Sequence, residues 1–218
     1  MSIRQADDSL AAPYETRWGT GWVYVRDGRL IGVDLPGEGP LEAARAAGAA
    51  APGASTEDAA RPAAADAQVE GAQSGAPSGT DAQALAFWAR ELESYFAGDR
   101  ATWAAGEVPL EHLGLGRFEL DVYEALLSIP PGDTVSYGEL AEMAGYPRAA
   151  RAVGNAMAGN PIPVVVPCHR VIRSDGTMGR YGNDPRWKER LLVHEGWVRS
   201  AEPSLLEQGA GEPPAKGS

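Results

Sequence analysis

The sequence predicts an α/β protein in two parts: a small N-terminal β-sheet with one helix, then a mainly helical region containing a helix-turn-helix. Three observations predict this class. Two apolar segments flank a tight turn near the N-terminus, residues 82–97 have a helical apolar period, and helix start and stop signals are closely spaced after residue 117. We place the two parts at residues 1–112 and 113–200, followed by a disordered tail at 201–218.

The N-terminal part begins with a predicted β-hairpin over residues 17–35. Trp22–Val25 and Leu30–Val33 are apolar segments on either side of Asp27-Gly28. That dipeptide favours a two-residue hairpin turn, because both of its positions tolerate positive φ.

A compositionally different segment follows over residues 36–82. The forty residues from Leu41 to Thr80 contain 16 Ala and no aromatic residue. They bury too little apolar surface to offset the entropy cost of ordering, so we expect a disordered insertion. An amphipathic core helix is predicted after it, over residues 82–97, from apolar residues at helical spacing: Leu85, Trp88, Leu92 and Phe96.

Three helices are predicted at the start of the C-terminal part. The apolar face of the first consists of Phe118, Val122 and Leu126. This helix ends near Ile129, which two prolines follow. The second starts at a capping box, with Ser136 as N-cap and Glu139 reaching back to it, and stops at Gly145.

The third helix is predicted to carry Pro147 in its first turn and to run to about Ala158, with Gly159 as its stop. Val153 and Met157 are four residues apart and are expected to face the core. The second and third helices then form a helix-turn-helix candidate.

Small side chains dominate this third helix, and Arg148 and Arg151 are its only charged residues. A helix with small side chains can bring its backbone close to a narrow surface. That surface is either another helix or a DNA groove into which Arg151 projects.

The net charge of −11 argues at first against nucleic acid, but the charges are unevenly placed. Residues 148–190 carry 8 basic and 3 acidic groups, and a local positive excess is what phosphate contact requires. No stretch approaches the roughly 18 apolar residues of a membrane span. Nor does the N-terminus have the apolar core of a secretory signal. We therefore expect a cytoplasmic protein without membrane contact.

Cys168 is the only cysteine, so neither an internal disulfide nor a cysteine-based zinc site is available. It follows Val164–Val166, a predicted buried strand, and it directly precedes His169 and Arg170. A free thiol has a pKa of about 8.5, so nucleophilic chemistry requires positive charge or a basic His that favours the thiolate. The alternative is an inert buried thiol, the commoner fate of a lone Cys.

A last helix is predicted from Asp184-Pro185, read as an N-cap and an N1 proline, to Glu195-Gly196. Glu195 is a candidate to orient His169, as an acid orients the imidazole in other nucleophilic sites. The alternative is a solvated carboxylate in the last turn. The apolar face of this helix consists of Trp187, Leu191 and Leu192.

Asn160-Pro161, read with the segment from Pro167 to Ile172, resembles the active-site motif of the O6-alkylguanine-DNA alkyltransferases, or methylated-DNA–protein-cysteine S-methyltransferases. The resemblance covers about residues 117–197 at matched spacing. It continues through Ser136-Tyr137-Gly138, Ala149–Gly154, Gly179 with Tyr181, and Leu191-Leu192 with Glu195-Gly196.

The resemblance implies a ribonuclease-H-like small sheet plus helix, followed by a winged helix-turn-helix-like domain that binds DNA and holds the active site. It implies that the alkyl group of O6-alkylguanine, and also that of O4-methylthymine, moves from duplex DNA to Cys168 after nucleotide flipping. The transfer would be irreversible and happen once per molecule. The family further implies a monomer with no cofactor and no metal.

The same resemblance assigns roles around the thiol. Cys168 would accept the alkyl group, His169 would deprotonate it through a water, and Glu195 would orient His169. Asn160 would hold the active-site turn. Tyr181 would lend its hydroxyl to the guanine ring as negative charge develops there.

On the DNA side, Tyr137 would crowd the phosphate beside the lesion and help to rotate the nucleotide outward. Arg151 would fill the vacated space in the base stack. The predicted DNA-contacting set is completed by Ser136, Arg148, Ala150 and Gly154.

The chain departs from the family pattern in four places. Gly182-Asn183-Asp184 stands where the family has small residues with a Gly-Gly pair, which bears on pocket shape and on tolerance of bulky alkyl groups. Asn155 occupies a position that is commonly small, and Ala158 one that is basic in some relatives. The fourth departure is the long insertion.

Two other classes of function are open. One is a non-enzymatic damage sensor or winged-helix regulator; relatives of that kind lack the acceptor Cys, which is present here. The other is a cysteine hydrolase or thiol redox enzyme, although the chain has no second Cys to resolve a disulfide. A hydrolase would turn over many times, so the number of turnovers separates it from an alkyl acceptor.

Overall fold

The computed structural model describes residues 9–37, 79–108, 110–179, 181–182, 184 and 186–198. Most of the predicted insertion, the predicted tail, Asn183 and Pro185 lie outside these residues. The two ends of the predicted insertion are described. Residues 36–37 form a turn, and residues 79–82 already belong to the following helix, so that helix starts earlier than predicted.

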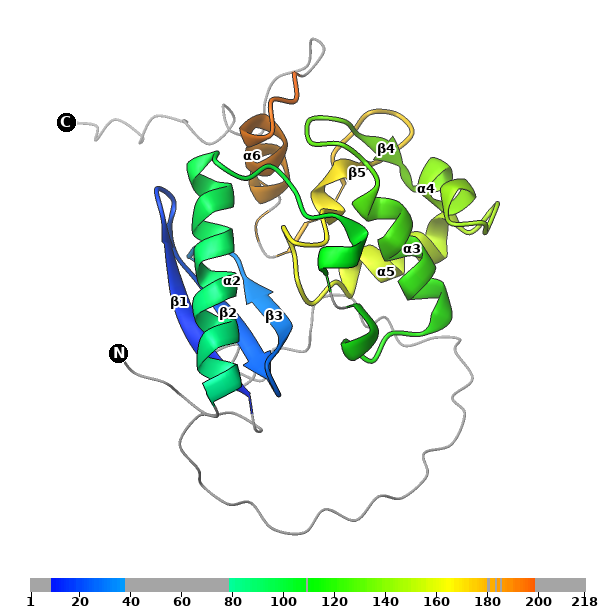
Figure 1. The fold of residues 1–218 in the computed structure, drawn as a ribbon. Coiled ribbons are helices and arrows are strands. Elements are labelled where there is room, and N and C mark those ends of the chain that lie inside the picture. The colour runs from blue at the N-terminus through cyan, green and yellow to red at the C-terminus, as the bar shows by residue number, and fades with distance from the viewer. Residues whose placement is uncertain are drawn as a thin grey trace, which may run out of the picture.

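A three-stranded antiparallel sheet in the order β1-β2-β3 forms the N-terminal part (Figure 1). Its strands are β1 (Leu10–Thr16), β2 (Gly19–Arg26) and β3 (Arg29–Asp34). The predicted hairpin is confirmed: Asp27 and Gly28 join β2 to β3 with φ of 51° and 74°. Strand β1 was not predicted, because Pro13 interrupts its pattern. Proline is tolerated there, since β1 is an edge strand.

Helix α2 (Gly79–Ala97) covers one face of this sheet (Figure 1). The predicted apolar face is confirmed, since Leu85, Trp88, Leu92 and Phe96 are all buried. Tyr14 of β1 stacks on Phe96 with ring centroids 5.8 Å apart. Two short 3-10 turns, η1 (Ala105–Glu107) and η2 (Leu110–His112), then lead to the C-terminal part.

Three helices open the C-terminal part: α3 (Arg117–Leu127), α4 (Tyr137–Met143) and α5 (Ala150–Ala158). The predicted capping box of α4 is confirmed, with Ser136 Oγ accepting from Glu139 N and Glu139 Oε2 accepting from Ser136 N. The predicted start of α5 is wrong. Pro147 lies in a turn outside the helix, because Arg148 has a left-handed φ of 73° that interrupts the helical path.

The core-facing side of α5 also differs from the prediction in one position. Val153 is fully buried as expected, but Met157 is only partly buried. Ala156 takes the second buried position of the helix. Because Ala156 is small, α5 lies close to α3, where the Tyr123 hydroxyl donates to the Ala156 carbonyl at 2.8 Å.

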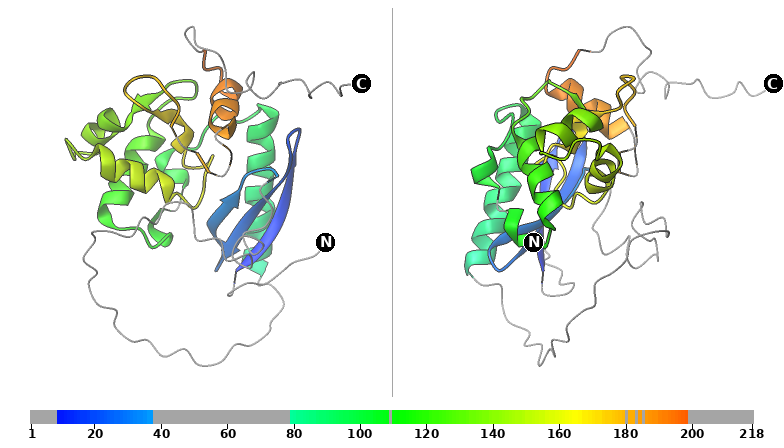
Figure 2. Two further views of the ribbon diagram at one scale, coloured as in Figure 1. Left: turned by 180° about the vertical axis from the view of Figure 1, so that it is seen from behind. Right: turned by 90° about the vertical axis from the view of Figure 1, so that its right-hand side faces the viewer.

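The remaining elements bring distant segments together. The 3-10 turn η3 (Cys168–Arg170) leads into β5 (Val171–Ile172), which pairs in parallel with β4 (Val135–Ser136). Helix α6 (Arg186–His194) follows and lies at the junction of the two parts (Figures 1 and 2). There, Trp187 of α6 packs edge-on against Trp18 of the β1–β2 turn, with ring centroids 5.9 Å apart.

One apolar cluster runs through both parts, from Leu10 of β1 to Leu191 of α6. The sheet and the helix-turn-helix region are therefore packed as a single body, with α6 and η3 at the contact between them. None of the helices in the described residues has the length and apolar character needed to cross a membrane.

Candidate active site

A compact loop over residues 160–167 positions the thiol of Cys168. The predicted strand over Val164–Val166 is wrong. These valines are buried, as their composition suggested, but Val164 has a φ of 75° and Val166 N donates to Ile162 O at 3.0 Å. A run of apolar residues predicts that the segment is buried, but it does not predict that the backbone is extended. Three prolines in or beside this run lack the N–H that a strand ladder needs: Pro161, Pro163 and Pro167.

The side-chain amide of Asn160 closes this loop and contacts the thiol. Its Oδ1 accepts from Ile162 N at 3.1 Å. Its Nδ2 donates to Val166 O at 2.9 Å and to Cys168 Sγ at 3.1 Å. One amide therefore fixes both the turn before the cysteine and the position of the sulfur.

The imidazole of His169 and the carboxylate of Glu195 form a buried pair. His169 Nε2 lies 2.8 Å from Glu195 Oε1, and their side chains are 0% and 1% exposed. Glu195 directly follows α6. Because its side chain is almost completely buried, the alternative of a solvated carboxylate is wrong. Because a carboxylate can only accept, Nε2 carries the hydrogen, and Nδ1 presents the lone pair of the neutral ring. That Nδ1 is buried and has no hydrogen-bond partner within the described residues.

The pKa values of the pair fit this tautomer. Burial lowers the pKa of His169 and outweighs the opposing effect of Glu195, so the ring is neutral at neutral pH. Burial acts in the opposite sense on Glu195. Contacts with His169 and Arg170 nevertheless hold the pKa of that carboxyl well below its ordinary value. The result is a neutral base hydrogen-bonded to a carboxylate that stays ionised.

The guanidinium of Arg170 holds the same carboxylate through two hydrogen bonds. Its Nε donates to Glu195 Oε2 at 2.9 Å and its Nη2 to Glu195 Oε1 at 2.8 Å. Nη1 donates to Ile129 O at 2.6 Å and to Thr102 Oγ1 at 3.3 Å, and Nη2 also reaches Ala101 O at 3.3 Å. Arg170 was not predicted to act in the site, and only its place next to His169 hinted at it.

Burial raises the pKa of the Cys168 thiol, contrary to the predicted need for a lowered value. The burial effect exceeds the opposing effects of Asn160, the Tyr181 hydroxyl and the charge of Lys188. The sequence indicated the nearby positive charge but could not show how completely the sulfur is removed from solvent. The resting thiol is therefore protonated and needs a base.

Two further side chains of the site come from the segments after β5. The ring of Tyr181 is buried and meets the His169 ring edge-on, with centroids 6.5 Å apart. Lys188 of α6 is 1% exposed, and burial lowers its pKa to about 8. Lys188 was missed by prediction, although it precedes Leu191 and Leu192 by three and four residues and so falls on the apolar face of the helix.

A hollow of about 570 Å³ lies between the start of α4, the start of α5 and the turn after β5. Tyr137 lines it; burial raises the pKa of Tyr137, and the charge of a Cys168 thiolate adds to that increase. Arg148 does not line the hollow; it is exposed in the turn before α5. The lining consists of Ser136, Tyr137, Gly138, Ala150, Arg151, Gly154, Arg173, Ser174 and Asp175.

The described residues contain no group of three His, Cys, Asp or Glu side chains that could hold a metal ion. The site itself offers a thiol, a neutral imidazole and a fixed carboxylate. Fold and site together define a helix-turn-helix protein with a buried thiol, next to a histidine and a carboxylate, and an open, partly basic hollow.

Comparison with known proteins identifies the family. Residues 117–197 match the family model described as "6-O-methylguanine DNA methyltransferase, DNA binding domain". Methylated-DNA–protein-cysteine methyltransferase from Mus musculus is 46% identical over 112 residues, which are 48% of this chain and 52% of that protein. The relative of the same name from Shigella flexneri is 45% identical over 113 residues, 50% of this chain and 61% of its own length. The chain thus spans half to three fifths of these curated relatives.

Solved structures match over a larger share of the chain. Mycobacterium tuberculosis OGT, solved in complex with DNA, is 30% identical over 85% of this chain and 92% of its own, with a TM-score of 0.58. The O6-methylguanine methyltransferase structure from the same organism is 29% identical over 88% and 96%, with a TM-score of 0.60. The chain belongs to the O6-methylguanine DNA methyltransferase family, and the predicted fold class is confirmed.

Proposed function

We propose that this protein repairs DNA by transferring the alkyl group of O6-alkylguanine, and that of O4-methylthymine, from double-stranded DNA to Cys168. The relatives named above are methylated-DNA–protein-cysteine methyltransferases, which supports the reaction class. The single observation that carries the proposal is the buried thiol, held by Asn160, next to a His169 imidazole whose far nitrogen is bound to Glu195.

The proton path starts at the thiol. His169 accepts the thiol proton on Nδ1, through one water molecule, and becomes an imidazolium. Glu195 stabilises that cation at 2.8 Å and keeps the ring oriented. Because the Cys168 pKa is raised, deprotonation accompanies the transfer and the resting enzyme does not store a thiolate. Lys188 supplies positive charge that lowers the cost of the thiolate as it forms.

In the transfer step, the sulfur attacks the alkyl carbon as the bond from that carbon to guanine O6 breaks. The electron pair stays with the base, where the Tyr181 hydroxyl donates a hydrogen bond to the developing charge. The base leaves as the guanine anion and takes up one proton at N1 from water, and the imidazolium returns the thiol proton to water. The products are then unmodified guanine and an S-alkylcysteine thioether. Water does not readily cleave a thioether, so each molecule acts once.

The hollow is where we propose that the duplex lies. The alkylated oxygen is hidden in the base stack, so the nucleotide must be flipped out at a cost of a few kcal/mol. Tyr137, which lines the hollow, crowds the phosphate beside the lesion, and Arg151 fills the vacated stack. Ser136, Ala150 and Gly154 let the backbone approach the groove, while Arg148 contacts phosphate at the edge.

We further propose domain boundaries at 1–112 and 113–200 and a monomer that needs no cofactor or metal. A cytoplasmic location fits the single thiol, which a reducing compartment would keep free.

The test is intact-mass analysis after incubation with a duplex oligonucleotide that carries O6-methylguanine. The expected result is a gain of one methyl group on the wild type and none on Cys168→Ala. An undiminished gain in Cys168→Ala would overturn the proposed acceptor. Tight lesion binding without any mass gain would instead identify a damage sensor.

A further inference from the structure

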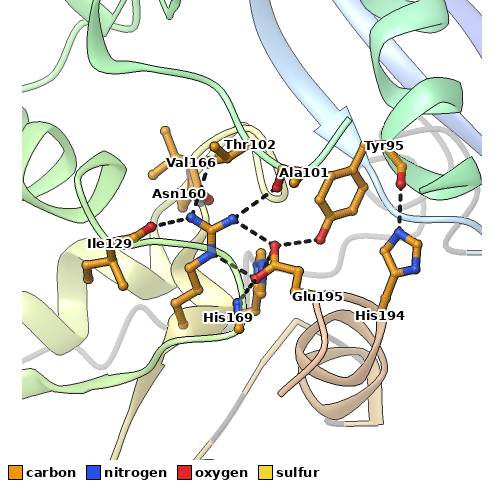
Figure 3. Close-up of polar contacts among 11 residues, drawn as sticks. Tyr95, Ala101, Thr102, Ile129, Asn160, Val166, His169, His194 and Glu195 are labelled. Carbon is orange, nitrogen blue, oxygen red and sulfur yellow. Dashed lines mark hydrogen bonds and ion pairs between the residues drawn. The ribbon is translucent and has the colours of Figure 1, made fainter. Parts of the chain in front are cut away.

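The N-terminal part contributes a hydroxyl group to the proposed reaction centre, the buried cluster of Cys168, His169, Arg170 and Glu195. Tyr95 lies on α2, the helix that covers the sheet, and its hydroxyl donates to Glu195 Oε1 at 2.8 Å (Figure 3). The two residues are separated by 100 positions in the sequence. The bond therefore joins the sheet-bearing part of the chain directly to the carboxylate that faces His169.

Glu195 Oε1 is the oxygen on which the network converges. It accepts from Tyr95 at 2.8 Å and from Arg170 Nη2 at 2.8 Å, and it lies 2.8 Å from His169 Nε2. The other oxygen, Oε2, accepts from Arg170 Nε at 2.9 Å and from Gly132 N at 3.5 Å. Three donors on one oxygen fix the plane of the carboxylate and share its negative charge.

We propose that Tyr95 is a positioning residue for alkyl transfer, which sets the orientation and basicity of Glu195 and, through it, the proton affinity of His169. The inference rests on the proposed function, because it assigns His169 as the base. It extends the site beyond the helix-turn-helix region to a residue of the N-terminal part.

Packing holds the Tyr95 hydroxyl in place. Its ring stacks on Trp103 at 5.8 Å and meets Phe96 and His194 edge-on, each at 5.2 Å. His194 Nε2 lies 2.7 Å from the Tyr95 carbonyl, so backbone and ring are both fixed. Burial, followed by the charge of Glu195, raises the pKa of Tyr95 well above its usual value, so the hydroxyl remains a donor.

The hydroxyl competes with His169 for the same negative charge. Without it, Oε1 would be more basic and would attract a proton on His169 more strongly, so the pKa of His169 would rise. Besides Glu195, the charges of Arg170 on η3 and Lys188 on α6 act on His169, the Tyr181 ring lies edge-on to it, and Cys168 directly precedes it in the chain. A Tyr95→Phe substitution leaves all four residues in place, so it removes only one of the hydrogen bonds that the Glu195 carboxylate accepts.

The experiment measures the rate of transfer from free O6-benzylguanine to Cys168 against pH, in the full chain. We expect Tyr95→Phe to slow transfer about tenfold, the effect of losing one hydrogen bond to a charged group. We also expect the acidic limb of the pH profile to move to higher pH. The matched control is Tyr14→Phe: Tyr14 is also fully buried against Phe96, but its hydroxyl donates to the Asp34 carbonyl at 2.9 Å, away from the site.

A double-mutant comparison separates positioning from loss of folding. In a Glu195→Gln background, Tyr95→Phe should have almost no further effect on rate, because its partner charge is gone. A slower Tyr95→Phe with an unmoved acidic limb, or the same rate as Tyr14→Phe, would overturn the proposal. So would full additivity with Glu195→Gln. If the wild type itself takes up no alkyl group, the proposed function fails, and that outcome is distinct from each of these.

Discussion

The reaction centre and the hollow beside it are built in opposite ways. In the centre, His169, Arg170 and Glu195 are almost completely buried, and every polar contact of Glu195 is made by a neighbouring protein group. In the hollow, Arg151 is exposed, and small residues of α5 leave the surface open. The side chains of the centre are held in place by contacts within the protein, whereas the exposed side chains of the hollow are accessible to a binding partner.

We expect this difference to separate the chemical step of the proposed reaction from the recognition of duplex DNA. Substitutions in the buried centre should change stability and the rate on every substrate, because buried charges that lose a partner are costly. Substitutions in the hollow should change only reactions that involve duplex DNA. Four substitutions, taken from the largest expected effect to the smallest, test whether the two regions can be separated.

Arg170→Leu should have the largest effect. It leaves the Glu195 carboxylate buried without its bidentate partner, so the free energy of unfolding should fall by about 3–5 kcal/mol. Chemical denaturation measures this. The matched control is Arg117→Leu, which breaks an ion pair to Asp121 in which Arg117 is 85% exposed. Equal stability changes in the two variants would contradict a buried network.

Glu195→Gln keeps the shape of the side chain but removes its charge. The imidazolium that forms during transfer loses its counter-ion, so we expect transfer to free O6-benzylguanine and to duplex DNA to slow about a hundredfold. The rate should then rise with pH toward the raised pKa of the thiol, because the free thiolate replaces the His-assisted reaction. Unchanged single-turnover rates and an unchanged pH profile would remove Glu195 from the mechanism.

Lys188→Met tests the buried cation near the sulfur. Because burial lowers the pKa of Lys188 to about 8, it is charged at neutral pH and neutral at higher pH. We expect the variant to react about tenfold more slowly than wild type at neutral pH, since the thiolate loses an attractive charge. The difference should shrink as pH rises through that pKa. A constant ratio across this range would show that the charge of Lys188 does not act on Cys168.

Arg151→Ala should have the smallest and most selective effect. We propose that this side chain replaces the flipped base, so its loss should slow transfer from duplex DNA about fivefold and leave the rate on free O6-benzylguanine unchanged. Arg90→Ala on α2 is the control, since Arg90 is exposed and remote from the hollow. Equal losses on both substrates would mean that Arg151 belongs functionally to the reaction centre.

Local patterns predicted the elements that line the hollow: a capping box at Ser136 and a helix of small residues that carries Arg151. The family resemblance added Ala150 and Gly154 in the hollow and Asn160 in the centre, whereas Arg173 in the hollow and Arg170 in the centre were not predicted. The hydrogen bonds of Arg170 and Tyr95 to Glu195 join residues 25 and 100 positions apart, and no local period encodes them. The left-handed Val164 likewise depends on the Asn160 amide and the tight loop that it closes, which composition does not reveal.

If the buried centre makes Cys168 an acceptor that is used once, a titration will show it. Increasing amounts of duplex DNA with O6-methylguanine are added to a fixed amount of protein, and the methyl group transferred is counted and located by peptide mapping. We expect a rapid phase that stops at one methyl group per molecule, all of it on Cys168. Continued turnover, or methyl groups on any other residue, would contradict it.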